Sequence, residues 1–139
     1  MSPELDKKLC DKYPKLLKQR NQPGTYMSFG VMCDDGWFFL LDKLFGHIKS
    51  YAKYNLENSK VEIAGVKEKF STLRIFVDGG DDRIQGMVSH TEYLSAFVCE
   101  TCGTTKNVGQ THKGWLKTIC LDCINKCGDK EESGWRLNE

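Results

Sequence analysis

Two Cys-x-x-Cys pairs constrain this chain more than any other feature of its sequence. Cys99 and Cys102 form the first pair, Cys120 and Cys123 form the second, and 17 residues separate the two pairs. Thiolates at this spacing, brought together by a short hairpin, complete the tetrahedral shell that Zn²⁺ prefers. Catalytic zinc keeps one position open for water, whereas four sulfurs close the shell. The pattern therefore predicts a structural Zn²⁺ site.

Two further residues compete with this ligand set. Cys127 lies four residues after Cys123, so on a helix it faces the same side, and His112 lies midway in the expected hairpin. We favour Cys120 over Cys127 because a paired spacing closes more easily around one ion. We expect His112 to be a surface residue.

The residues around the two pairs predict a treble-clef-like zinc lobe. Gly103 follows the first pair directly, and a glycine there permits the positive φ of a zinc knuckle. A hairpin through Gly109 and Gly114 comes next, and the second pair leads into a short helix. Trp115, beside that pair, is expected to lie in the core and to cover the zinc shell.

The rest of the chain predicts an α+β fold, with helices packed on a small antiparallel sheet. Apolar residues recur at helical spacing over about 4–20, with a break at Pro14, over about 37–54 and over about 82–97. Polar and apolar side chains alternate, as in strands, over 26–33, 61–65 and 73–77. We expect residues 1–98 to form this core and 99–139 to form the zinc lobe, packed together as one compact unit.

Composition narrows the class of protein. The 139 residues are 40% hydrophobic and 28% charged, which is typical of a globular protein. The longest aromatic and aliphatic run, Trp37 to Leu41, is far shorter than the roughly 20 residues that cross a bilayer. The first residues lack the order of a secretory signal, so we expect a cytoplasmic protein with reduced thiols and no membrane partner. Trp37, Cys10 and Cys33 are expected to be buried.

The charge pattern leaves nucleic-acid binding as an alternative. A formal net charge of +1 argues against a general nucleic-acid coat, because such binding depends on neutralising phosphates. Any contacts would come from local clusters. The lobe offers Lys106, Lys113, Lys117 and Lys126.

The lobe resembles a GATA-type DNA-binding finger in its Cys-x-x-Cys-Gly-Thr-Thr segment and in the spacing of its pairs. The resemblance implies a helix that reads the major groove and a basic tail that contacts phosphates. Here the helix is followed by 128–132, which reads Gly-Asp-Lys-Glu-Glu, so the phosphate-binding part of the family is missing.

A second basic cluster lies in the expected hairpin, where Lys67, Lys69 and Arg74 bracket Phe70. Cations around an aromatic ring suit a phosphate with a stacked base, so this cluster is the candidate site of a protein that sequesters a nucleotide signal. The simpler interpretation is a solvated strand edge, since lysines discourage edge-to-edge pairing, with Phe70 in the core.

The sequence predicts no enzyme. It contains no assignable Ser/His/Asp set, catalytic carboxylate pair or phosphate-cradling glycine loop. The HNH nucleases have a related outline, but 17 residues between the cysteine pairs leave no room for the elements that hold their catalytic metal.

Four motifs in order resemble a family of small proteins common in bacteriophages and prophages. They are KYPKL at 12–16, DGWF at 35–38, VKEKF at 66–70 with LRIF at 73–76, and CETCG at 99–103 with GWL at 114–116 and Cys120. The resemblance implies a phage-type origin but no assigned activity. Small phage proteins without catalytic residues act by binding. We therefore expect a binding protein whose partner is a host defence or regulatory component, with nucleic acid and a nucleotide as the alternative ligands.

Overall fold

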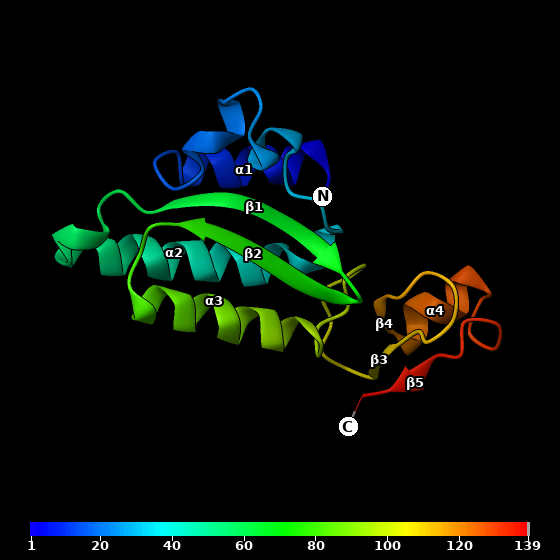
Figure 1. The fold of residues 1–139 in the computed structure, drawn as a ribbon. Coiled ribbons are helices and arrows are strands. Elements are labelled where there is room, and N and C mark those ends of the chain that lie inside the picture. Colours follow the sequence, from blue (N-terminus) through cyan, green and yellow to red (C-terminus); the bar gives the residue numbers. More distant parts are fainter. Residues whose placement is uncertain (139) are drawn as a thin grey trace.

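The computed structural model describes residues 1–138 and has the α+β fold that the sequence predicts. The helices are α1 (Pro3–Lys12), α2 (Phe38–Tyr54), α3 (Asp82–Ser95) and α4 (Leu121–Cys127). The strands are β1 (Glu62–Lys69), β2 (Thr72–Asp78), β3 (Val108–Gln110), β4 (Thr118–Cys120) and β5 (Arg136–Leu137). Short 3-10 helices are η1 (Lys18–Asn21), η2 (Tyr26–Phe29), η3 (Asp35–Trp37) and η4 (Leu56–Asn58). Figure 1 shows the cysteine-rich lobe beyond one end of the β1–β2 hairpin.

The β1–β2 hairpin is the centre of the larger part of the molecule. Its antiparallel register runs from the pair Glu62–Asp78 to the pair Lys69–Thr72. The turn consists of Phe70 and Ser71, with φ angles of 53° and 66°. Positive φ at both positions is what a two-residue turn needs to match the twist of the strands. The first strand therefore extends beyond the predicted end at residue 65.

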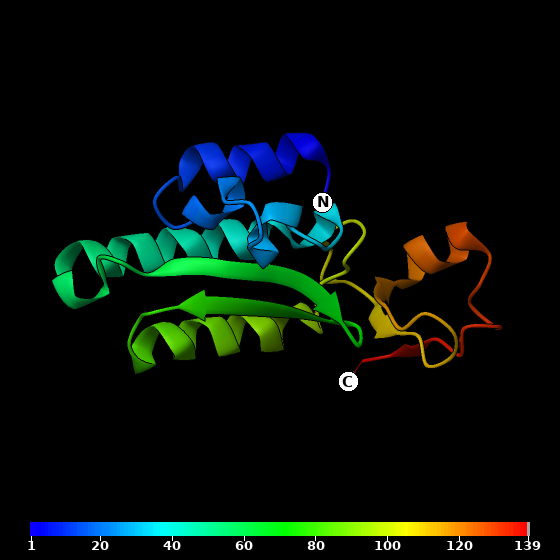
Figure 2. The same ribbon diagram turned by 45° about the horizontal axis from the view of Figure 1, so that its top comes forward.

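The main core lies between this hairpin and the helices. Leu41, Phe45 and Ile48 of α2 are fully buried, as the helical spacing predicts. They belong to the same apolar cluster as Ile63 of β1 and Leu73 of β2. Helix α3 runs along β2, and both ribbon views place it on the opposite side of the hairpin from α1 (Figures 1 and 2).

Trp37 is completely buried, as predicted, and its indole Nε1 donates a hydrogen bond to the Val98 carbonyl at 2.8 Å. Cys33 is also buried as predicted, and burial raises the pKa of its thiol to about 12. Cys10 is only half-buried, so the prediction for this residue was wrong in degree. Burial, followed by the nearby Asp6 carboxylate, raises the pKa of the Cys10 thiol.

The N-terminal third departs most from the predicted pattern. Helix α1 ends at Lys12, two residues before Pro14, so the proline break is confirmed. The strand predicted over 26–33 is wrong, because Tyr26–Phe29 form a 3-10 helix. Gly30 then takes φ of 82° and turns the chain, and only Met32 pairs with β1.

Asp42 ties the segment after α1 to α2 and gives a testable pH dependence. Its carboxylate accepts hydrogen bonds from Lys12 Nζ at 2.7 Å and from Tyr13 Oη at 2.8 Å. Desolvation raises the pKa of this carboxyl, but these two bonds outweigh it and hold the pKa below its ordinary value.

A depressed folded-state pKa stabilises the fold above the ordinary carboxyl pKa, and that stabilisation is lost as pH falls through the folded value. Asp42→Asn should therefore lower the free energy of unfolding at pH 7 by on the order of 1 kcal/mol. The deficit should shrink as the pH falls through the acid range. Denaturant titrations at pH 7 and at acid pH measure the difference, and a deficit independent of pH would contradict this account.

None of the helices within residues 1–138 is long and apolar enough to span a membrane.

Candidate metal centre

The lobe is built from a knuckle, a three-stranded sheet and a short helix. Its strand order is β4-β3-β5, with both pairings antiparallel. In the knuckle, the Gly103 amide donates to the Cys99 carbonyl at 2.8 Å, and Gly103 has φ of 79°. The positive φ predicted for this glycine is confirmed. Knuckle, hairpin and helix follow in the order of a treble clef.

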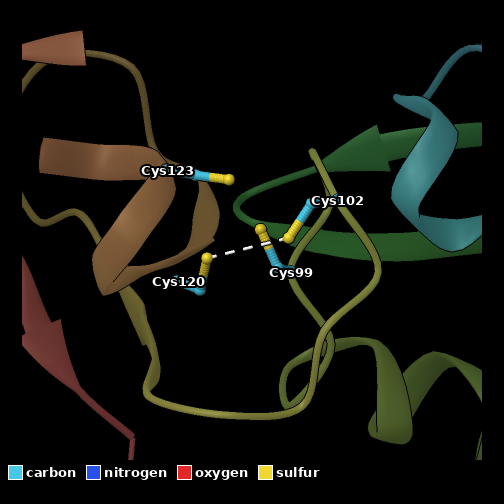
Figure 3. A group of neighbouring side chains, drawn as sticks. All are labelled: Cys99, Cys102, Cys120 and Cys123. Carbon is cyan, nitrogen blue, oxygen red and sulfur yellow. Dashed lines mark hydrogen bonds between the residues drawn. The ribbon is translucent and has the colours of Figure 1, made fainter. Parts of the chain in front are cut away.

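Each pair of cysteines is presented by a different part of the lobe. Cys99 and Cys102 lie on the knuckle, Cys120 ends β4, and Cys123 lies in the first turn of α4 (Figure 3). The Sγ atoms of the four cysteines all lie within 4.8 Å of one another. The structure thus brings together the four side chains that the sequence selects.

The sulfur separations fit a metal with four thiolate ligands. The Sγ atoms of Cys102 and Cys120 are 3.7 Å apart, the pair joined by the dashed line in Figure 3. A regular tetrahedron with Zn–S bonds of about 2.3 Å has edges of roughly 3.8 Å. The cluster is therefore close to the size of a tetrathiolate metal site.

Electrostatics within the cluster also favour a cation. Burial raises the pKa of the Cys99 thiol, but backbone N–H groups of Cys120, Cys102 and Thr101 outweigh it and place that pKa below the ordinary thiol value. Burial and the neighbouring thiols raise the pKa of Cys123. Four thiolates so close repel one another, so they can ionise together only if a cation supplies positive charge.

The two competing ligands lie outside the cluster. Cys127 is exposed at the end of α4, and His112 is exposed in the β3–β4 loop. Among the described residues, the group that could hold a metal consists of the four paired cysteines alone. The preference for Cys120 over Cys127 therefore matches the observed grouping.

The prediction that Trp115 covers the metal shell was wrong. Its side chain is 79% exposed in the β3–β4 loop, where the preceding Gly114 has φ of 67°. Trp135 packs against the small apolar core of the lobe instead, and its Nε1 donates to the Ile119 carbonyl at 2.8 Å. A Cβ on Gly109 would lie 2.6 Å from the Trp135 ring, so only glycine permits this approach.

The candidate nucleic-acid residues of the lobe do not form one free cluster. Lys117 forms an ion pair with the exposed Asp34 of the larger part of the molecule, whereas Lys106, Lys113 and Lys126 are exposed and form no ion pair with the described residues. The residues that follow α4 include Asp129, Glu131 and Glu132, which are also exposed. Among the described residues of the lobe, exposed acidic side chains therefore accompany the exposed lysines, unlike the basic tail of a GATA-type finger.

The candidate residues of the hairpin are arranged differently. Lys67 and Arg74 are directly opposite each other on β1 and β2, and Lys69 lies further along β1. Phe70 is 69% exposed at the turn, so the prediction that it lies in the core was wrong. Two exposed aromatic residues near this cluster, Tyr26 and Phe76, were not selected from the sequence.

The knuckle that carries Cys99 and Cys102 is hydrogen-bonded directly to residues 1–98. The Gly36 amide donates to the Glu100 carbonyl at 2.7 Å, and the Asp34 amide donates to the Glu100 carboxylate at 3.1 Å. The Thr118 hydroxyl donates to the Ser71 carbonyl at the hairpin turn. Buried Glu100 lies directly after Cys99, so the same short segment carries a cysteine of the cluster and the hydrogen bonds to residues 34 and 36.

A scan against protein-family models and searches of curated proteins and of solved structures return no match to this chain.

Proposed function

We propose that the four-cysteine cluster binds one Zn²⁺ ion and that this ion is structural. The observation that carries the proposal is the convergence of four sulfur atoms within 4.8 Å of one another. Sulfur is a soft ligand that zinc accepts readily, and four thiolates leave no coordination position for water or a substrate. Cys99, Cys102, Cys120 and Cys123 are the ligands.

X-ray absorption at the zinc edge tests the ligand set. The zinc-loaded protein should give four sulfur neighbours at about 2.3 Å and no nitrogen neighbour. A shell that contains one nitrogen at about 2.0 Å would instead make His112 a ligand and would contradict the proposed set.

We further propose that the protein is a non-enzymatic binding protein of phage type whose partner is a host defence or regulatory protein. The motif resemblance supports the origin, and the closed sulfur shell supports a scaffolding role for the metal. Trp115 supports protein binding, because exposed tryptophan is rare on free surfaces and is enriched among the residues that dominate protein interfaces.

The loop around Trp115 is held in a defined conformation. The Thr111 hydroxyl donates to the Trp115 carbonyl at 2.9 Å and accepts the Lys117 amide at 2.8 Å. The tryptophan is therefore presented on a fixed loop, which lowers the entropic cost of binding.

Trp115→Ala tests this proposal with little effect on the fold, since the side chain is 79% exposed. Metal-loaded wild-type protein should retain one stoichiometric host protein on an affinity column, and the variant should bind it at least about 30-fold more weakly, as expected for an interface hot spot. Tyr54→Ala, at a residue 76% exposed on α2, serves as the matched control. If the two variants behave alike, Trp115 is not the anchor. If no protein is retained at all, the proposed partner class is wrong.

A further inference from the structure

The outward side of the β1–β2 hairpin carries a set of residues that the metal centre does not use. In this register Gly65 faces Phe76, Lys67 faces Arg74 and Lys69 faces Thr72, so these side chains share one side of the sheet. Val66, Leu73 and Ile75 are on the other side and are buried. We call the outward set, together with Tyr26 of η2, the hairpin face.

Two aromatic rings lie close together on the hairpin face. Tyr26 and Phe76 are 54% and 46% exposed. A Cβ on Gly65 would be 3.3 Å from the Phe76 ring and 3.5 Å from the Tyr26 ring, so both rings rest on the flat backbone of this glycine. About half of each ring therefore remains open to solvent and is available to a ligand.

Cations are placed among these rings. Lys67 Nζ lies 5.0 Å from the Tyr26 ring centroid and 5.4 Å from the Phe76 centroid, and Arg74 lies directly across the strand. At the turn, Lys69 Nζ lies 5.3 Å from the Phe70 ring. The cations therefore lie between two sets of rings, with Tyr26 and Phe76 on one side and the Phe70 ring at the turn on the other.

The cations on the hairpin face form no ion pair with the described carboxylates. Within residues 1–138, no carboxylate oxygen lies within 4.0 Å of the charged nitrogens of Lys67, Lys69 or Arg74. The acidic residues at the far end of the hairpin, Glu62 and Asp78, both accept hydrogen bonds from the Gln19 amide. At the turn end the Glu68 carboxylate accepts a hydrogen bond from the Ser71 amide at 2.7 Å, and its strand position puts it on the other side of the sheet from the three cations.

Single-stranded nucleic acid is the ligand whose chemistry matches this pattern. Its bases stack on exposed aromatic rings, and its phosphates pair with cations that flank the rings. From Gly65 to Phe70 the strip extends roughly 16 Å, at about 3.3 Å per strand residue, which is longer than one nucleotide. A short strand therefore covers the face better than a mononucleotide does.

We propose that the hairpin face binds single-stranded nucleic acid, with bases stacked on Tyr26 and Phe76 and phosphates held by Lys67, Lys69 and Arg74. This site goes beyond the proposed host-protein partner and does not depend on Trp115. It assigns a ligand class to the hairpin residues rather than to the lysines of the lobe.

Fluorescence anisotropy with labelled 12-nucleotide oligo(dT) and oligo(rU), and with a duplex of the same length, tests the site. Wild-type protein should bind the single strands saturably and more tightly than the duplex. If three phosphates are neutralised, the log–log dependence of affinity on salt should have a slope of about −2, since single strands contribute about −0.7 per phosphate.

Two double variants, each with a matched control, separate the contribution of charge from that of stacking. Lys67→Gln with Arg74→Gln should bring the salt slope close to −0.7, since about one neutralised phosphate would remain. The matched control, Lys106→Gln with Lys126→Gln, removes the same charge from the lobe and should keep the wild-type slope. Tyr26→Leu with Phe76→Leu should weaken binding at least about 25-fold at an unchanged slope, and Phe39→Leu with Tyr93→Leu, at exposed rings on α2 and α3, should not.

Several results would overturn the assignment. They are the absence of oligonucleotide binding at low salt, equal affinity for the duplex, and equal losses from the hairpin and lobe charge variants. If UMP or TMP displaces the labelled strand as effectively as an unlabelled oligonucleotide at the same molar concentration, the ligand is a mononucleotide. If the ring variant loses the host protein but oligonucleotides never bind, the face is a protein-docking surface. Circular dichroism melts of each variant confirm that the fold is intact.

Discussion

Replacing Cys102 with serine should abolish zinc binding and unfold the lobe. Serine removes one of the four thiolates, and its hydroxyl is a harder and far less acidic ligand. Metal binding contributes on the order of 10 kcal/mol to the folding of small zinc modules. The free energy lost with the metal should therefore exceed the stabilisation that packing within the lobe provides.

The lobe core explains why the loss should be so large. Its fully buried cluster consists of Cys99, Cys120, Val108, Ile119 and Ile124. Two of these five are proposed ligands, so three aliphatic side chains remain to hold the lobe without a metal. A core of that size does not stabilise a fold by itself.

Cys127→Ser is the matched control for this experiment. Cys127 is also exposed and also in the lobe, but it lies outside the sulfur cluster. Its replacement should leave the melting temperature and the zinc content unchanged. Hydrogen exchange measured by mass spectrometry should show rapid exchange over 99–138 in Cys102→Ser alone. An unaltered melting temperature in Cys102→Ser would falsify the structural role of the cluster.

Gly36→Ala should destabilise the protein by about 3 kcal/mol or more, the upper end of the cost of overpacking. A Cβ at this position would lie 2.2 Å from the Cys99 carbonyl oxygen and 2.4 Å from the Glu100 carbonyl oxygen. Both contacts are with backbone atoms, so no side chain can rotate away to relieve them. The knuckle must shift, and the hydrogen bond from the Gly36 amide to Glu100 must lengthen.

A second glycine provides the comparison. Gly86 lies within α3, and a Cβ there would meet nothing within 4 Å. Gly86→Ala should be neutral or stabilising by up to about 1 kcal/mol, because alanine favours the helix. Denaturant unfolding measures both variants, and metal content shows whether the Gly36 variant also loosens the knuckle. Equal free energies of unfolding for the two variants would show that the knuckle backbone leaves room for a Cβ at residue 36.

The grouping of the four cysteines could be predicted because its determinants are local. Each Cys-x-x-Cys pair lies on one turn, and the glycine after Cys102 permits that turn without information from the rest of the chain. The preference for Cys120 over Cys127 rested on the same local geometry. Trp37 and the helix that follows it were also predictable, since a thick apolar stripe at helical spacing must be buried.

Features set by contacts between distant segments could not be predicted. The strand expected over 26–33 has the alternation of a strand, but Gly30 takes φ of 82° and turns the chain. The segment is held by a hydrogen bond from Arg20 Nη1 to the Ser28 carbonyl at 2.9 Å and by one from the Val31 amide to the Asp6 carboxylate at 3.1 Å. Trp135 directly precedes β5, a two-residue strand with no periodicity to detect, so its packing in the lobe could not be predicted. Lys117 is paired with Asp34, 83 residues away in sequence.

The β1–β2 hairpin contains one feature that could be predicted from the sequence and one that could not. Lys67, Lys69 and Arg74 were identified from the sequence as one cluster, and the antiparallel register places them on one side of the sheet. Phe70 was placed in the segment that joins the two strands and was expected to lie in the core rather than to serve as a stacking surface. It lies instead at a turn with φ of 53°, whereas Tyr26 reaches the cluster from outside the hairpin.

Metal content per chain tests the central claim most directly. Protein purified without added metal or chelator should carry one zinc per chain by elemental analysis, and native mass spectrometry should give a single one-metal species. Cys127→Ser should carry the same amount, and Cys102→Ser should carry none. Wild-type protein that folds without any bound metal, or zinc retained in full by Cys102→Ser, would contradict the account.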